Sequence, residues 1–333
     1  MEYPANVTQL PRRSLGFFPT PVIELRNLTK YLGGPRILMK RDDQTGLALG
    51  GNKVRKLEFL MGDALAQGAD VVVTGGAAQS NHCRQTAAAA AVCGMACHLA
   101  LGGSPPASMN GNLLLDSLLG ATIHWSGECR KGENIPEICE DLRRQGKRPY
   151  IIPYGGSNVI GAVGFVEAVR EISVQLGTDI ADISHVVFAS SSGGTHAGLL
   201  VGRALHGLEF QVTGINIDKG ETGERSLGEH ILELADSTAG LLGVSPSFSA
   251  GDLVLLDDYV GAGYGVIGDL EREAITLTAR HEGILLDPVY TGRAMGGLLD
   301  LIGKKEVDRA ASVLFWHTGG SPALFACADQ LIR

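Results

Sequence analysis

The alternation of short, β-branched apolar runs with longer stretches rich in alanine and leucine constrains the fold of this chain most strongly. Strands are predicted for residues 37–40, 71–74, 98–101, 122–125, 186–189, 211–217 and 312–316. Helices are predicted for residues 54–67, 81–93, 111–119, 161–176, 196–205, 268–282 and 292–302. Strands that alternate with helices form βαβ units, in which parallel strands share a sheet and helices cover both of its faces. The sequence therefore predicts an α/β fold with open, mostly parallel twisted sheets.

Four glycine-rich or polar loops follow predicted strands. They span residues 46–52, 75–80, 190–195 and 318–321, and the pair Gly75-Gly76 is predicted to form a turn. Ligands of open α/β sheets gather outside the carboxyl ends of the strands. We therefore expect the four loops to meet at one sheet edge and to form a common site.

Lys53 follows two glycines and an asparagine and stands where a helix is predicted to begin. The positive end of a helix dipole disfavours an ammonium group, and a lysine with a lowered pKa is a nucleophile. The glycines let the backbone approach a flat ligand closely. Lys53 is therefore a candidate for a lysine that bonds covalently to a cofactor, although a surface lysine at a helix start would show the same local pattern.

The run Ser-Ser-Ser-Gly-Gly-Thr at 190–195 lies between a predicted strand and a predicted helix. Backbone N–H groups at such a turn, together with a helix N-terminus, suit a phosphate. An ordinary glycine-rich turn is the alternative. Ser80 and Asn81 also stand at a predicted helix start, where they could cap the helix or face a substrate. Tyr290 and Thr291 lead into a further helix.

Composition narrows the classes of function. The formal net charge of −8 argues against a nucleic-acid partner, which would require a clustered basic face. No run reaches the ~18 uncharged apolar residues of a membrane span, and no cationic start precedes an apolar segment. The six cysteines form no C-x-x-C pair, so they are expected to be buried thiols and not metal ligands. These features predict a cytoplasmic protein without a metal.

Several runs, in this order along the chain, resemble the family of D-cysteine desulfhydrases and 1-aminocyclopropane-1-carboxylate (ACC) deaminases. The resemblance extends from about residue 15 to residue 325. The runs are KRDD at 40–43, GGNKVRKLE at 50–58, QSNH at 79–82, SGGTHAG at 192–198, DPVY at 287–290 and HTGGSPALF at 317–325.

The resemblance implies pyridoxal-phosphate fold type II, similar to tryptophan synthase β, with two three-layer αβα domains. It implies a large domain of residues 1–54 plus 162–333, a small inserted domain of residues 55–161, and a homodimer. Lys53 would carry pyridoxal 5'-phosphate as a Schiff base. The other implied cofactor contacts are Asn52, Asn81, Ser192, Gly193, Gly194, Thr195, Thr291 and Thr318. The implied substrate contacts are Ser80, Asn81, His82, Tyr264 and Tyr290. Of these, Ser80, Tyr264 and Tyr290 join Lys53 as catalytic candidates.

Two threonines guide the choice of reaction within the resembled family. ACC deaminases carry a glutamate at the position of Thr291 and a leucine at that of Thr318. A carboxylate beside the pyridine nitrogen strengthens the electron sink that ring opening needs, whereas threonine hydroxyls suffice when a good leaving group departs from the β-carbon. The predicted reaction is therefore α,β-elimination from an amino-acid substrate, with D-cysteine yielding pyruvate, hydrogen sulfide and ammonia.

Three alternatives remain open at this point. An L-cysteate sulfo-lyase would use the same scaffold and release sulfite, with Tyr154 and Lys219 as candidates for contact with a charged β-group. ACC deaminase is the next alternative. A binding protein for a small molecule would keep the phosphate loop but would not need Lys53.

Overall fold

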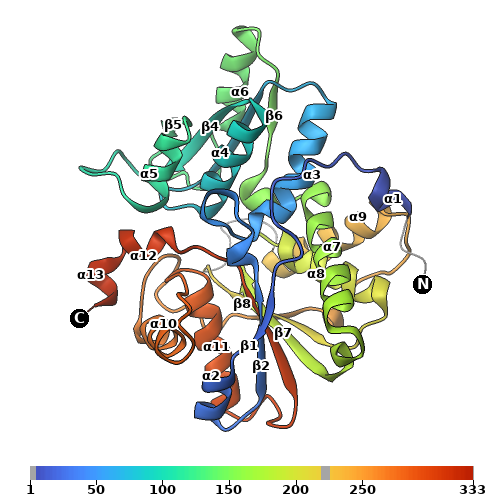
Figure 1. The fold of residues 1–333 in the computed structure, drawn as a ribbon. Coiled ribbons are helices and arrows are strands. Elements are labelled where there is room, and N and C mark those ends of the chain that lie inside the picture. The colour runs from blue at the N-terminus through green and yellow to red at the C-terminus, as the bar shows by residue number, and fades with distance from the viewer. Residues whose placement is uncertain (1–4, 219–225, 333) are drawn as a thin grey trace.

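The computed structural model describes residues 5–218 and 226–332, which form two sheets with helices on both faces of each (Figure 1). The larger sheet has six strands and lies in the lower part of Figure 1. Its order is β1 (Val22–Glu24), β2 (Arg36–Arg41), β10 (Ser312–His317), β7 (Ile183–Ser190), β8 (Gln211–Asn216) and β9 (Val254–Leu256). All pairs are parallel except β1 with β2.

The second sheet is entirely parallel and lies in the upper part of Figure 1. Its order is β5 (Thr122–Trp125), β4 (Ala96–Gly102), β3 (Val71–Ala77) and β6 (Pro149–Ile151). The predicted α/β class with mostly parallel sheets is therefore confirmed.

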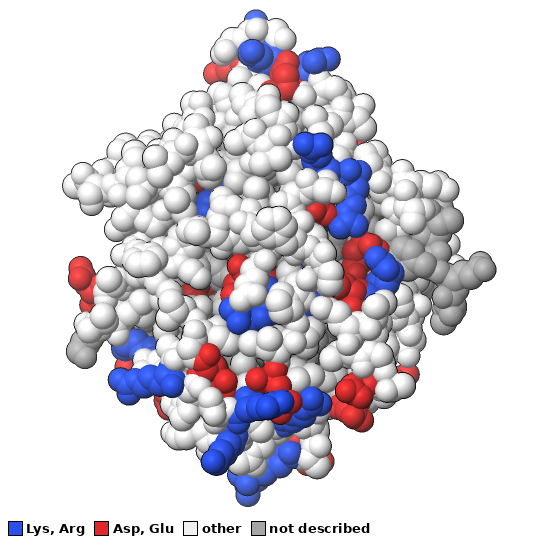
Figure 2. Space-filling model, viewed as in Figure 1, with Lys and Arg blue, Asp and Glu red and all other residues white. Residues whose placement is uncertain are grey.

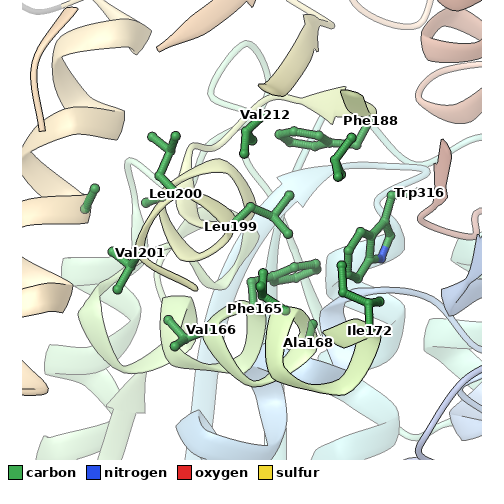
Figure 3. Close-up of a cluster of buried hydrophobic side chains, with 14 of the residues drawn as sticks. Phe165, Val166, Ala168, Ile172, Phe188, Leu199, Leu200, Val201, Val212 and Trp316 are labelled. Carbon is green, nitrogen blue, oxygen red and sulfur yellow. The ribbon is translucent and has the colours of Figure 1, made fainter. Parts of the chain in front are cut away.

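Successive side chains of the central strands enter opposite cores, as the period of two in a strand requires. Leu314 and Trp316 of β10 pack with α7 (Val159–Leu176), α8 (Gly194–His206) and α9 (Leu227–Leu241). Figure 3 shows Trp316 beside Phe165 and Leu199 in this core. Val313 and Phe315 point the other way, to α2 (Arg26–Leu32), α10 (Asp269–Glu282) and α11 (Thr291–Gly303).

The smaller sheet is covered in the same way. Val72 and Leu99 pack towards α3 (Lys53–Ala66), α4 (Asn81–Cys93) and α5 (Gly111–Leu118). Val71 and Val73 face α6 (Ile135–Arg144). Three short helices complete the described chain, namely α1 (Ala5–Gln9), α12 (Pro322–Ala326) and α13 (Ala328–Leu331).

The predicted elements agree with the observed ones at most positions. Helix α4 has the predicted bounds, and Gly94 ends it in the left-handed conformation. The predicted turn at Gly75-Gly76 is wrong, because both residues lie inside β3. Both positions are glycine because a side chain would not fit. A Cβ at Gly75 would lie 2.5 Å from the backbone of Gly132, and one at Gly76 would lie 2.6 Å from Ser80 Oγ.

A buried ion network fixes the first turn of α3 to the larger sheet. Arg55 donates to both carboxylate oxygens of Asp42, at 2.7 and 2.8 Å, and also pairs with Glu171 of α7. Lys40 of β2 contacts the same Glu171. Although burial opposes ionisation, the Arg55 and Lys40 cations hold the pKa of Glu171 at about 2. Removing one partner of a buried pair typically costs ~3–5 kcal/mol, so this network strongly constrains where α3 begins.

Within the described ranges, every helix is too short or too polar to cross a membrane.

Candidate active site

Lys53 is the first residue of α3, and the loop before it is so tightly packed that two positions accept only glycine. Gly50 and Gly51 have φ values of 70° and 130°, which favour glycine. A Cβ at Gly50 would lie 2.0 Å from the carbonyl oxygen of Asp43, and one at Gly51 would lie 2.4 Å from Gln85 Nε2. This close packing directs the Lys53 side chain into a cavity.

The cavity is lined by residues from all four predicted loops. The expectation that the four loops meet at one sheet edge is wrong. The segment at 75–80 includes the end of β3, in the smaller sheet, whereas the other three loops follow strands of the larger sheet. The site therefore lies between the two sheets, where α3 passes from one to the other.

Two lysines of α3 share this environment. Burial lowers the pKa of Lys53 to about 8, an effect that contact with Lys56 partly offsets. Burial and the positive charge of Lys53 hold the pKa of Lys56 well below its usual value. Lys56 is fully buried and donates hydrogen bonds to the carbonyl oxygen of Gly155 and to Ser157 Oγ, both at 3.1 Å. A neutral amine at Lys53 is therefore available near pH 8, as a nucleophile requires.

The loop at 190–195 delivers the N-terminus of α8 to the same cavity. Ser192, Gly193 and Thr195 line the cavity. Gly194 lies just behind the wall, and its N–H donates to Ser157 Oγ at 3.1 Å. A Cβ at Gly194 would lie 3.0 Å from Lys56 Nζ, so glycine lets the lysine reach the helix end. Backbone N–H groups, a helix N-terminus and a buried lysine amine together suit a phosphate.

The N-terminus of α4 supplies three polar side chains to the cavity. Ser80 caps the helix by accepting from the Cys83 N–H at 3.2 Å, which leaves its own O–H free to donate. Asn81 follows it in the wall. His82 Nε2 lies 2.9 Å from Thr74 Oγ1, and its Nδ1 is buried without a protein partner. Burial and the two nearby lysines hold the pKa of His82 well below its usual value, so its ring is neutral.

Tyr290 lines the cavity, and Tyr264 stands behind it. Their hydroxyl oxygens are 2.7 Å apart. Burial raises the pKa of both phenols, so both remain protonated at neutral pH. Arg130, from the smaller-sheet side, lies 4.9 Å from the centre of the Tyr264 ring and pairs with Asp218, which follows β8.

Thr291 and Thr318, the two threonines that guided the choice of reaction, occupy different surroundings. Thr318 lines the cavity, next to Asn52, whose backbone N–H donates to the Thr318 carbonyl oxygen. Thr291 does not reach the cavity, because its hydroxyl donates to the Asp287 carboxylate at 2.8 Å and accepts from the Asp287 N–H at 2.7 Å. In this structure Thr291 stabilises the turn that presents Tyr290, and a contact between Thr291 and the cofactor stays a prediction.

Most of the other predicted site residues line the cavity. They are Asn52, Lys53, Ser80, Asn81, His82, Ser192, Gly193, Thr195, Tyr290 and Thr318. Gly194 and Tyr264 stand behind the wall. Tyr154, an alternative candidate, is also in the wall, whereas Lys219 lies outside the described residues.

Lys56 is a residue near the cavity that the sequence predictions missed. Its signal was present, because residues three apart on a helix share a face and Lys56 follows Lys53 by three. Nothing in the sequence distinguished it from the solvated lysines common on helices. Only its burial beside the α8 N-terminus identifies it.

The matches to known proteins agree with this geometry. A family model described as "Pyridoxal-phosphate dependent enzyme" matches residues 13–319. The chain belongs to this family. A D-cysteine desulfhydrase of Salmonella choleraesuis (strain SC-B67) is 44% identical over 331 residues, covering 96% of this chain and 97% of the relative. A D-cysteine desulfhydrase of Salmonella typhi is equally similar, with the same coverage.

Solved structures extend the likeness to the whole fold. A structure described as an ACC deaminase homologue is 38% identical and has a TM-score of 0.90, covering 98% of this chain and 97% of its own. A processed threonine deaminase isoform 2 of Solanum lycopersicum has a TM-score of 0.68 at 16% identity, covering 98% and 90% of the two chains, and shares the fold alone. Fold type II is therefore confirmed, with pyridoxal phosphate as the family's cofactor.

The residues present fit pyridoxal phosphate. Gly155 keeps the space beside Lys53 open, because a Cβ there would lie 2.1 Å from Ser192 Oγ and 3.5 Å from Lys53 Nζ. The anion-binding end of α8 lies on the same side of the cavity as this amine. The Lys53 amine would react with the aldehyde of pyridoxal phosphate, and the start of α8 would bind its phosphate.

The lowered pKa of Lys53 predicts how the cofactor-free protein takes up pyridoxal phosphate. Burial disfavours the charged amine of Lys53. Its reactive neutral form therefore accumulates as the pH approaches about 8, a lower pH than a free lysine requires. The rate of covalent capture is measured from the visible absorbance that appears after mixing. This rate is expected to rise by about tenfold per pH unit below pH 8 and to level off above it. A capture rate that keeps rising to pH 10 would contradict a lowered pKa.

Proposed function

We propose that this protein is a pyridoxal-phosphate-dependent carbon–sulfur lyase that converts D-cysteine and one water to pyruvate, hydrogen sulfide and ammonia. The observation that carries the proposal is the buried Lys53 amine, with its pKa lowered to about 8, in the wall of a cavity that also holds the N-terminus of α8. The full-length similarity to D-cysteine desulfhydrases supports the choice of substrate.

Six side chains and the N-terminus of α8 are assigned to cofactor binding. Lys53 forms the covalent link. Lys56 and the N–H groups at the start of α8 neutralise the phosphate, and the hydroxyls of Ser192 and Thr195 complete its shell. Thr318 would contact the ring nitrogen of the bound cofactor, and Asn81 would donate to its ring oxygen. When bound, the cofactor withdraws electrons from the substrate's α-carbon.

The α4 N-terminus is assigned to substrate binding. The Ser80 hydroxyl, whose oxygen already accepts a hydrogen bond, donates to the substrate carboxylate, and the positive end of α4 favours the same anion. The neutral imidazole of His82 lies nearby and adds no competing charge. This arrangement orients the α-carbon towards Lys53 Nζ, which takes the α-proton.

Tyr290 is assigned to the departing β-group. Its phenol is protonated and fixed by the 2.7 Å contact with Tyr264, so it can give a proton to a leaving thiolate. Tyr264 acts as its positioning partner. Thr318, a neutral hydroxyl beside the expected position of the ring nitrogen, supports elimination of a good leaving group over ring opening.

The substrate assignment predicts a clear ranking in a panel of amino acids. Pyruvate release is measured for D-cysteine, L-cysteine, L-cysteate, ACC, D-serine and β-chloro-D-alanine. D-cysteine is expected to give a kcat/KM at least about tenfold above L-cysteine, L-cysteate and ACC, because pocket contacts discriminate between substrates at the transition state. The Lys53→Ala variant is the control and is expected to release no pyruvate. Rapid release from L-cysteate without release from D-cysteine would contradict the assignment.

We further propose that the protein is a homodimer that pairs through the face formed by α5 and α12. Leu118 and Phe325 are each 73% exposed there, and Met109 and Leu114 lie on the same side. Figure 2 shows few charged side chains over this region, on the left of the view. Exposed apolar patches of this kind commonly mark an interface.

The dimer proposal is tested by light scattering of Leu118→Glu and Phe325→Glu. The unchanged protein is expected to have twice the mass of one chain, and each variant the mass of a single chain. Val174→Glu, at an equally exposed apolar residue on α7, is the matched control and is expected to stay dimeric. A monomeric unchanged protein, or dissociation by Val174→Glu alone, would contradict the proposed face.

Two further assignments accompany these. We propose residues 55–161 as a small domain inserted in a large one, supported by the second sheet, whose strands all lie within that range. Limited proteolysis that cuts first near both boundaries would support it. We propose a cytoplasmic location, supported by six free cysteines. Recovery of the activity in an extracellular fraction would contradict it.

A further inference from the structure

A chain of side-chain hydrogen bonds runs from the interior of α4 through the start of α5 to the cavity. Arg84 and Asn112 are fully buried members of this chain. Arg84 Nη1 donates to Asn112 Oδ1, and Asn112 Nδ2 donates to Asn81 Oδ1, both at 2.8 Å. Asn81 is the member that lines the cavity.

The direction of every bond in this chain is determined by chemistry. A guanidinium has donors and no acceptor, so the atom of Asn112 that faces Arg84 must be the oxygen. Independently, the other end of the Asn112 amide faces the backbone carbonyl oxygen of Gln79 at 2.8 Å, so this end must be the nitrogen. Asn112 can therefore present only an N–H donor to Asn81.

The same logic reaches the cavity. Because Asn112 donates to the oxygen of Asn81, the amide nitrogen of Asn81 is the atom left for a ligand. It points towards the loop after β10, since a Cβ on Gly320 would lie 2.8 Å from Asn81 Nδ2. The Arg84 cation is itself held in place, because its Nη2 donates to the Gly50 carbonyl oxygen at 2.6 Å, in the glycine pair that precedes Lys53. Although burial lowers the pKa of Arg84 to about 10, it stays charged at neutral pH.

We propose that Arg84, acting through Asn112, orients the Asn81 amide so that it offers an N–H donor to the ring oxygen of the cofactor. Arg84 and Asn112 are positioning residues, since neither lines the cavity. This inference rests on the proposed function, which assigns Asn81 to the cofactor. The inference explains why the Asn81 amide, which could rotate by 180°, presents its nitrogen to the cofactor and not its oxygen.

The variant Asn112→Asp isolates this role. The new carboxylate still accepts from Arg84 but cannot donate to Asn81. The Asn81 amide then turns to donate back to it, and the Asn81 oxygen faces the oxygen of the cofactor. Loss of one hydrogen bond and its replacement by two facing acceptors is expected to weaken pyridoxal-phosphate binding by the refolded apoprotein by about tenfold or more. The absorption maximum of the bound cofactor is expected to shift as well.

The matched control is Asn110→Asp, which introduces the same charge two residues away on the exposed N-cap of α5. It is expected to leave both the Kd for pyridoxal phosphate and the absorption maximum unchanged. A urea unfolding curve for each variant reports whether it folds. If Asn112→Asp does not fold, Asn112→Ala takes its place, because it also removes the donor to Asn81.

A double-variant comparison separates positioning from general damage. In an Asn81→Ala background, the change at Asn112 is expected to add no further loss of cofactor affinity, because its effect passes through Asn81. If the losses of cofactor affinity caused by the Asn81 and Asn112 changes add in full, the inference is overturned. It is also overturned if the Asn112 variant keeps the cofactor affinity and spectrum of the unchanged protein. If Asn81→Ala alone leaves the cofactor Kd and spectrum unchanged, the proposed role of Asn81 fails and the orienting role fails with it. If Asn81→Ala weakens binding while Asn112→Asp does not, the orienting role alone fails.

Discussion

The buried ion pair between Arg55 and Asp42 is the interaction on which the site depends most. Asp42 directly follows β2 of the larger sheet and also accepts from Trp316 Nε1 at 2.7 Å and from Thr20 Oγ1 at 2.9 Å. One carboxylate thus joins β2, β10 and the first turn of α3. Because Lys53 lies two residues before Arg55, the same contacts fix where the lysine enters the cavity. A displacement of even 1 Å at a reacting group can cost catalysis heavily, so such a rigid anchor is functionally important.

The electrostatics of the cavity match a ligand that brings negative charge. Lys53, Lys56 and the N-terminus of α8 are crowded into one buried region, and burial lowers the pKa of both amines. A phosphate relieves this crowding at Lys56 and α8, and it leaves Lys53 free for covalent chemistry. His82 is uncharged and the tyrosine hydroxyls are protonated, so these groups add no charge of their own to that of the lysines.

Much of this arrangement could be predicted from the sequence, because local patterns determine local structure. The alanine-rich stretch that ends at Gly94 predicted α4 to the residue, and glycine-rich loops at strand ends predicted which segments would meet. Sequence could not reveal that the loops come from two sheets, since strand order depends on long-range packing. Thr291 and Thr318 looked equivalent in sequence, yet a hydrogen bond to Asp287 removes the first from the cavity. Lys56 and Asn112 were missed for the same reason, because burial and hydrogen-bond partners are three-dimensional facts.

The most direct test of the account is to locate the cofactor's covalent bond in the intact protein. The purified protein is treated with borohydride, which makes the link permanent, and its proteolytic peptides are sequenced by tandem mass spectrometry. The account predicts a phosphopyridoxyl group on Lys53 and none on Lys56, although the two amines lie on the same face of α3. A label on Lys56, or on a lysine outside the cavity, would contradict the central claim that Lys53 carries the cofactor.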